Sequence, residues 1–213
     1  MKKNIFDPSK LLLGNVALII LLSLFGPEEK NLGKNVKLVY LHGAWVLAAE
    51  IAFVLAGIVG GLGLLLWAIK KFDGGKAAFG WSRALGITGI IYWVTYLPLS
   101  MLAMQSNWNG LFLAEPRFRL AMTFAIVGIL LQVGLWMMNQ DKLTAVANIA
   151  YIIFLRIVFA NAANIMHPPP SPIFNSGNYV IISFFVAMIA LTFSSALLVA
   201  ILCHKQINKA NQA

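Results

Sequence analysis

Residues 41–69 read LHGAWVLAAEIAFVLAGIVGGLGLLLWAI, a run of 29 residues with one acidic side chain, Glu50, and no lysine or arginine. At about 1.5 Å of rise per residue, a helix of this length exceeds the roughly 30 Å hydrocarbon core of a bilayer. The run therefore predicts a membrane-spanning helix that tilts or projects beyond the core. Its step from Gly57 to Gly61 allows another backbone or a flat ligand to approach closely.

The rest of the chain repeats this pattern. The 213 residues are 60% hydrophobic and 11% charged, with a mean hydropathy of +0.82, a composition that suits lipid rather than water. Five further apolar runs lie at 11–26, 79–104, 118–138, 143–165 and 179–203. We therefore expect an all-α polytopic membrane protein with a single domain over 1–213, formed by a bundle of about six transmembrane helices.

Basic residues are distributed unequally between the two sets of connecting segments. If both termini lie on the inner side, ten lysines and arginines flank the inner helix ends and five flank the outer ends. The positive-inside rule then places both termini in the cytoplasm. The net charge of +9 is thus mainly a topological signal, and the scatter of the basic residues predicts no nucleic-acid partner. A single cysteine, Cys203, excludes multi-cysteine metal sites.

Two histidines are expected at the same depth near the outer face. His42 starts the second predicted helix and His167 follows the fifth. Neutral imidazole is a strong ligand of haem iron, so two imidazoles on different helices can serve as the axial ligands of a haem. Each histidine can also be an ordinary interfacial residue, and both interpretations stay open. His204 lies at the opposite side, where it offsets a helix dipole.

Glu50 and Arg156 lie inside the second and fifth predicted helices, where an unpaired charge costs several kcal/mol. At ~1.5 Å of rise per residue, Glu50 lies about 12 Å inward of His42 and Arg156 about 16 Å inward of His167, so both lie at similar depths below the outer surface. We expect them to form an intramembrane ion pair, so that these two helices are neighbours. The pair is either structural or in contact with a buried cofactor or a proton path.

The outer segment 105–119 joins the third and fourth helices. Its composition suits an interfacial amphipathic segment, or simply an aromatic belt with flanking charges. If a haem is bound, aromatic faces can cover it while Arg117 and Arg119 bind its propionates through charge-assisted hydrogen bonds. The aromatic and charged residues of the segment are Trp108, Phe112, Glu115, Arg117, Phe118 and Arg119.

Three parts of the chain resemble the haem-handling proteins of cytochrome c maturation, of the CcmC type, and the resemblance covers about 38–200. Tyr40-Leu-His42-Gly-Ala-Trp45 is similar to the family's Tyr-x-His-Val-Pro-x-x-Trp. The string from Trp108 to Arg117 is similar to its Trp-Gly-x-Trp-Trp-x-Trp-Asp-x-Arg, with Glu115 at the position of the Asp. Asn164-Ile-Met-His167, followed by Phe174-Asn175, is similar to its second histidine loop.

This resemblance implies a haem b at the outer face of a bacterial inner membrane, with His42 and His167 as axial ligands. Trp45, Trp108, Glu115, Arg117 and Arg119 would surround the ring. The chain departs from the family in three ways. Leu111, Phe112 and Ala114 replace three tryptophans of the signature, and the acid is Glu rather than Asp. Three prolines follow the second histidine. The implied partners are other membrane subunits, or a periplasmic haem chaperone or cytochrome.

These departures leave three functions open. The first is haem transfer in cytochrome c maturation. The second is electron transfer by a b-type cytochrome whose haem is never released, and the third is a structural subunit that binds nothing. No nucleophile, base and acid occur at the spacing of a known catalytic motif, so the chain is not expected to be an enzyme in the ordinary sense.

Overall fold

A computed structural model describes residues 7–163, 166 and 173–210 of the chain. The described residues contain no strand, which confirms the expected all-α class. The elements in chain order are α1 (Pro8–Leu24), α2 (Val36–Ala68), α3 (Phe72–Trp108), α4 (Pro116–Met138), α5 (Asp141–Ala160), the short 3-10 helix η1 (Phe174–Ser176) and α6 (Tyr179–Ala210).

Five of the six α-helices, α2 to α6, are long and apolar enough to cross a membrane. The first helix, α1, is apolar but has 17 residues, or about 26 Å of length, which falls short of the ~30 Å core. The multi-pass architecture is therefore supported, with five helices of spanning length and one shorter helix beside them.

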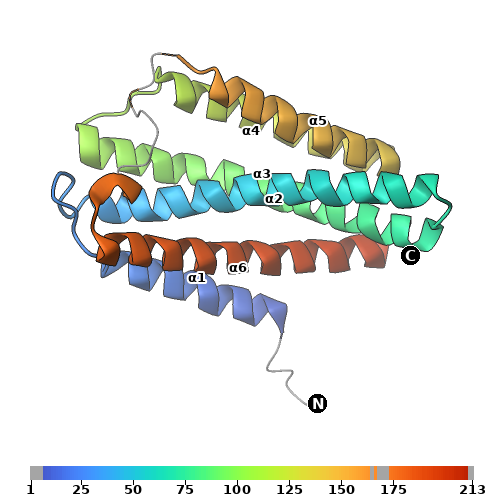
Figure 1. Cartoon of the computed structure of the whole chain (residues 1–213), viewed down its shortest axis with the longest axis horizontal. Helices are drawn as coiled ribbons and strands as arrows, with labels where there is room; N and C mark the ends of the chain where they lie inside the picture. Colours follow the sequence, from blue (N-terminus) through green and yellow to red (C-terminus); the bar gives the residue numbers. More distant parts are fainter. Residues whose placement is uncertain (1–6, 164–165, 167–172, 211–213) are drawn as a thin grey trace.

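The helices form three layers (Figure 1). The central layer is the α2–α3 pair, with α1 and α6 on one side of it and α4 and α5 on the other. In the described part of the chain α5 contacts α2, α3 and α4, whereas α6 contacts α1, α2 and α3, and α5 and α6 do not touch. The expected neighbours α2 and α5 do lie side by side.

Two helices end at residues other than those that the sequence suggested. The helix α3 has 37 residues, contains Pro98 in its interior and runs on to Trp108, four residues beyond the apolar run 79–104. The helix ends there because Asn109 adopts a left-handed conformation with φ of 53°, a conformation that asparagine tolerates well. In contrast, α5 ends at Ala160, five residues before the end of the apolar run 143–165.

Glycines on α2 allow α5 to approach closely, but they are not the pair expected. A Cβ added to Gly60 would lie 2.8 Å from Ser82 Oγ and 3.2 Å from Ala145 Cα, and one added to Gly57 would lie 3.1 Å from Ile152 Cγ2. A Cβ added to Gly61 would meet nothing nearer than 3.8 Å. The contact therefore runs through Gly57 and Gly60, and the Gly57–Gly61 step is correct only at its first residue.

A buried polar network joins four helices next to this contact. Asn148 Nδ2 donates to Ser82 O and Ser82 Oγ at 3.0 and 3.1 Å, and Ser82 Oγ donates to Ala56 O at 2.8 Å. Gln132 Nε2 on α4 donates to Asn148 Oδ1 at 2.9 Å. Polar groups in lipid have no water to bond, so such a network holds helices together. The α4–α5 hairpin is thus fastened to α2 and α3 at this end, called the inner end below.

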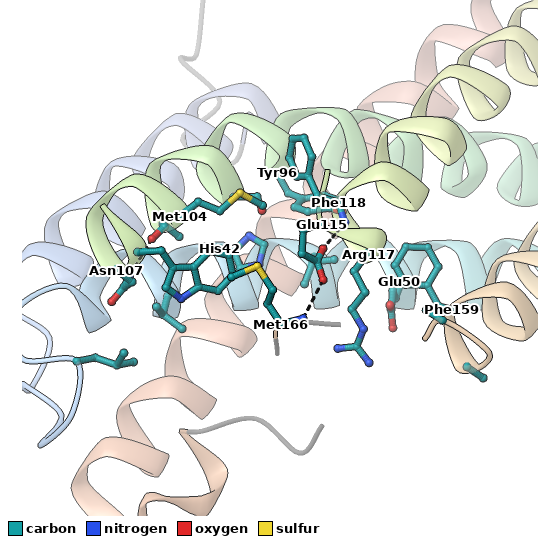
Figure 2. Close-up of a pocket in the computed structure, with 18 of the residues that line it drawn as sticks. His42, Glu50, Tyr96, Met104, Asn107, Glu115, Arg117, Phe118, Phe159 and Met166 are labelled. Carbon is teal, nitrogen blue, oxygen red and sulfur yellow. Dashed lines mark hydrogen bonds between the residues drawn. The ribbon is translucent and has the colours of Figure 1, made fainter. Parts of the chain in front are cut away.

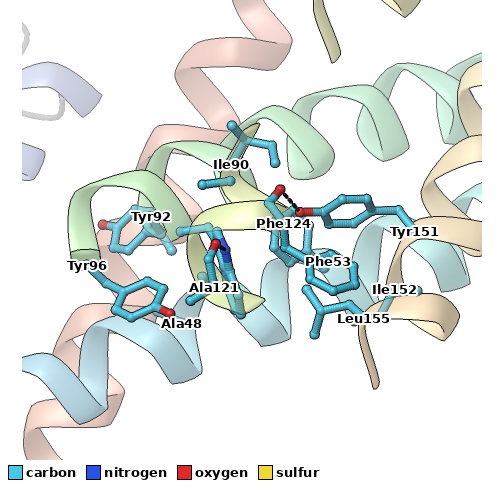
Figure 3. Packing of buried hydrophobic residues seen from close by; sticks show 14 residues of the cluster. Ala48, Phe53, Ile90, Tyr92, Tyr96, Ala121, Phe124, Tyr151, Ile152 and Leu155 are labelled. Atoms are coloured by element: carbon cyan, nitrogen blue, oxygen red, sulfur yellow. Dashed lines mark hydrogen bonds between the residues drawn. The ribbon is translucent and has the colours of Figure 1, made fainter. Parts of the chain in front are cut away.

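At the opposite, outer end, which holds His42 and Trp108, the α4–α5 hairpin spreads away from α2 and α3 (Figure 1). An aromatic cluster fills the angle between the two pairs, with Phe53, Trp93, Phe124 and Tyr151 at its centre (Figure 3). Tyr151 Oη donates to Phe124 O at 2.8 Å, and Trp93 Nε1 to Ala121 O at 2.9 Å. The hydroxyl of Tyr151 and the indole N–H of Trp93 are thus bonded to backbone carbonyls of α4 within the cluster.

We predict that Gly60→Ala destabilises the protein by about 1–3 kcal/mol, the usual cost of overpacking, because the new methyl group would press on the backbone of α5 at Ala145. Thermal unfolding in detergent measures this cost. Gly61→Ala is the matched control, since it makes the same chemical change one residue away, where the nearest atom lies at an ordinary contact distance of 3.8 Å, and it should not lower the melting temperature. Equal effects of the two substitutions would contradict the assignment of the contact to Gly60.

Candidate functional site

A cavity of about 950 Å³ occupies the outer end, where the α4–α5 hairpin diverges from α2 and α3 (Figure 2). Four helices and the segments next to them line it, and most of its wall is apolar. Eight residues that the sequence singled out line this one cavity: His42, Glu50, Trp108, Glu115, Arg117, Phe118, Arg156 and Asn175.

One face of α2 supplies the back of the cavity. Val39, His42, Val46 and Glu50 recur at helical spacing and all line it. The His42 ring lies against Tyr96 of α3, with ring centroids 5.5 Å apart. His42 is half-buried, so its imidazole is held within the wall and is still reached from the cavity.

Glu115 joins two walls of the cavity. It is the N-cap of α4, and its carboxylate, 7% exposed, accepts a hydrogen bond from Phe118 N at 2.6 Å. Its other oxygen accepts from Met166 N at 3.4 Å, across 51 residues of sequence. The sequence predicted that Glu115 binds the cofactor; in the structure its oxygens bind backbone amides and hold the segment after α5 at the cavity (Figure 2).

Glu50 and Arg156 form the expected ion pair. Arg156 Nη1 donates to Glu50 Oε2 at 2.8 Å, which links α2 and α5 at the edge of the cavity. The two partners differ in burial, since the Arg156 side chain is 60% exposed and that of Glu50 is 23% exposed. Arg117, in the first turn of α4, lines the same cavity (Figure 2).

Trp108 and Asn175 close the outer rim. Trp108 is the last residue of α3 and packs edge-on against Phe112, with ring centroids 5.8 Å apart. The loop at 25–35, between α1 and α2, also reaches this rim. Asn35 Nδ2 donates to Ser106 O at 2.6 Å, and Leu32 lines the cavity. The rim therefore combines parts of the chain that are remote in sequence.

Two of the predicted ring-contacting residues lie elsewhere. Trp45 stacks on Tyr92 at 5.0 Å and donates from Nε1 to Thr95 Oγ1 at 2.9 Å, so it packs against α3 and does not line the cavity. Arg119 is exposed and also lies off the cavity wall. One residue separates Arg119 from Arg117, and on a helix such a shift turns a side chain away from its neighbour's face.

The second predicted iron ligand, His167, lies outside the described residues, as do Asn164 and the prolines that follow the histidine. Met166, its described neighbour, lines the cavity. The described residues contain no group of three or more His, Cys, Asp or Glu side chains that would hold a bare metal ion.

Sequence reasoning missed the part of α3 that faces the cavity. These residues follow one stripe of the helix at intervals of three and four, a pattern that becomes visible once α3 is extended to Trp108. Met166 carried no such signal, because it follows the end of α5 in an irregular segment. The residues of the stripe are Tyr96, Ser100, Ala103, Met104 and Asn107.

Replacing Glu115 by alanine should release the backbone amides that it binds. Loss of an N-cap costs on the order of 1 kcal/mol, so amide exchange at Phe118 and Met166 should accelerate several-fold. Hydrogen–deuterium exchange with peptide-level mass spectrometry measures both positions. Glu28→Ala is the control, since Glu28 is an exposed acid on the same side of the bundle. Unchanged exchange at both amides in Glu115→Ala would show that Glu115 does not hold this segment.

Comparison of the chain with models of known protein families, with curated proteins and with solved structures finds no match. A function is therefore inferred from the cavity and its residues.

Proposed function

We propose that the chain binds haem b in the outer cavity and serves haem transfer in cytochrome c maturation. His42 is one axial ligand in this proposal and His167 the other. The observation that carries it is the assembly of His42, Trp108 and Arg117 on the wall of one cavity, although they come from α2, α3 and α4. These are residues on which the sequence resemblance rests, and their position on one cavity supports the shared site that the resemblance implies.

The chemistry of the wall fits this ligand. A volume of about 950 Å³ lies at the upper end of the range usual for cofactor pockets, roughly 300–1,000 Å³, and the wall is mainly apolar with a few polar groups. Haem is a flat apolar ring with two carboxylates at one edge, and Arg117 and Arg156 supply guanidinium groups, which bind carboxylates through paired hydrogen bonds. Haem iron takes its remaining ligands from the protein, so two histidines suffice and a larger cluster is not needed.

The position of Met166 supports the second ligand. Met166 N is bound to Glu115 and Met166 lines the cavity, so the chain is at the cavity wall one residue before His167. Glu115 acts here as a positioning residue for the segment that carries the ligand.

A second candidate function is electron transfer by a b-type cytochrome that keeps its haem within a larger membrane complex. One observation favours it: Leu111, Phe112 and Ala114, which replace the signature tryptophans, line a separate shallow depression beside the cavity rather than the cavity itself. The surface from which the family would release haem is therefore changed, whereas the residues that hold it are kept.

The decisive experiment is a reduced-minus-oxidised optical spectrum of the protein purified after expression with sufficient haem. We expect a b-type α-band in the wild type, and its loss or shift in His42→Ala and in His167→Ala. His204→Ala is the matched control, because His204 stacks on Trp81 at 4.3 Å at the inner end and should leave the spectrum unchanged. A wild-type protein without any haem band would refute the proposal and favour a structural subunit.

Two further measurements separate transfer from electron transfer. A haem that moves to an acceptor apocytochrome supports delivery. A haem that is reduced by quinol and stays bound through purification supports the b-type cytochrome. Partners differ accordingly: a periplasmic haem chaperone or cytochrome in the first case, and other membrane subunits in the second.

We further propose that the protein lies in a bacterial inner membrane with both termini in the cytoplasm. Single cysteines placed in a Cys203→Ser background test this with a membrane-impermeant maleimide on intact cells. We expect labelling at Lys30→Cys, on the outer side, and protection at Lys76→Cys, on the inner side; both positions are exposed. The reverse pattern would invert the topology and place the cavity in the cytoplasm.

A further inference from the structure

Arg156 belongs to two surfaces at once. It lines the cavity, and its side chain is 60% exposed on α5. Its exposed neighbours on the helix are apolar: Ile153 and Ile157 are 54% and 55% exposed, and Ala160 one turn further is exposed and also lines the cavity. The cavity therefore reaches the lipid-facing side of α5 at Arg156 and Ala160.

No other described helix covers this side. The cavity lies between α2 and α5, and α6, the next neighbour of α2, does not touch α5. The cleft along α2 and α5 at Glu50, Arg156 and Ala160, called the lateral seam below, is thus not covered by a further helix in the described part of the chain. Arg156 lies four residues from the end of α5, about 6 Å below the end of the helix.

The guanidinium of Arg156 is only partly satisfied within the described residues. Its one hydrogen bond there joins Nη1 to Glu50 Oε2, whereas a guanidinium carries several N–H donors in a planar fork. In lipid each remaining donor needs an acceptor, because no bulk water is present. Glu50 holds the group in place, and the exposed edge of the fork suits a carboxylate or phosphate.

We propose that the lateral seam is the entrance of the cavity for an amphiphile from the outer leaflet, and that Arg156 binds its carboxylate or phosphate group. This deepens the proposed function, because haem is such an amphiphile, but it does not depend on iron ligation. The apolar body of the ligand passes between α2 and α5, while its acidic end moves along Arg156 near the level of the lipid head groups. A ligand that arrives this way never crosses the aqueous phase.

Metal-free protoporphyrin IX tests the anion site, because it carries the two carboxylates but makes no axial bond. Binding to the protein in phosphatidylcholine nanodiscs is followed by porphyrin fluorescence, beside the dimethyl ester as an uncharged analogue. Arg156→Gln should weaken protoporphyrin about tenfold, the loss expected for one charge-assisted hydrogen bond, and leave the ester unchanged. Arg119→Gln, an exposed arginine off the cavity, is the matched control.

A second variant keeps the test valid if an unpaired Glu50 disturbs folding. Glu50→Gln with Arg156→Gln removes both charges together and should give the same tenfold loss. Spin-labelled phosphatidic acid identifies the other source of the anion: loss of its immobilised signal in Arg156→Gln, with protoporphyrin unaffected, assigns the site to a lipid head group and also supports the proposal. If neither probe responds to either variant, the anion site is refuted.

The route is tested by blocking the lateral seam. Ala160→Trp should slow the loading of protoporphyrin from donor vesicles several-fold, whereas Ala150→Trp, an exposed alanine of α5 deeper in the bundle, should not. Equal rates in the two variants would overturn the lateral entrance. If iron haem gives no b-type band while protoporphyrin binding still depends on Arg156, the proposed haem ligation fails and the lateral anion site stands.

Discussion

The close approach of α5 to α2 at Gly57 and Gly60 is the contact on which the rest of the structure depends. In lipid the hydrophobic effect does not drive helices together, so their association needs close packing and interhelical hydrogen bonds. Close packing and interhelical hydrogen bonds occur together at the inner end, where Ala145 packs against Gly60 and Asn148 donates a hydrogen bond to Ser82. With the hairpin fastened at that end, its outer half is free to diverge, and the cavity is the consequence.

Two acidic residues of the cavity wall have different roles. Glu115 lies where α4 meets the segment after α5, and its carboxylate accepts hydrogen bonds from backbone amides of both. Glu50 lies between α2 and α5, and it is paired with Arg156, whose side chain is exposed and also lines the cavity. Because a carboxylate in an apolar environment must be bonded, its partners decide whether it can act on a ligand.

Much of the architecture was predictable, because the bilayer permits few solutions: apolar runs of spanning length must form helices. The Glu50–Arg156 pair was predictable for the same reason, since two charges of opposite sign inside apolar helices and at similar depths stabilise each other. Helix ends were not, because Trp108 and Ala160 end their helices through local backbone conformation and not through composition. The orientation of Trp45 also depended on the rotation of α2, which its uniformly apolar surface does not encode.

Because the helices differ in length, the cavity has a polar rim and an apolar floor. α2 and α3 have 33 and 37 residues, about 50 and 55 Å, whereas α5 has 20, about 30 Å, so the central pair extends beyond the membrane-spanning length of α5. Asn107 and Trp108 lie on this extension and form a polar rim, while the floor at Tyr96 and Phe118 remains apolar. Arg156, one turn below the end of α5, provides charge at an intermediate depth on the lipid side. A cavity with an apolar floor, a polar rim and a charged lateral edge matches a molecule with the same three properties, and this gradient is the physical reason to assign it an amphiphile rather than a polar solute.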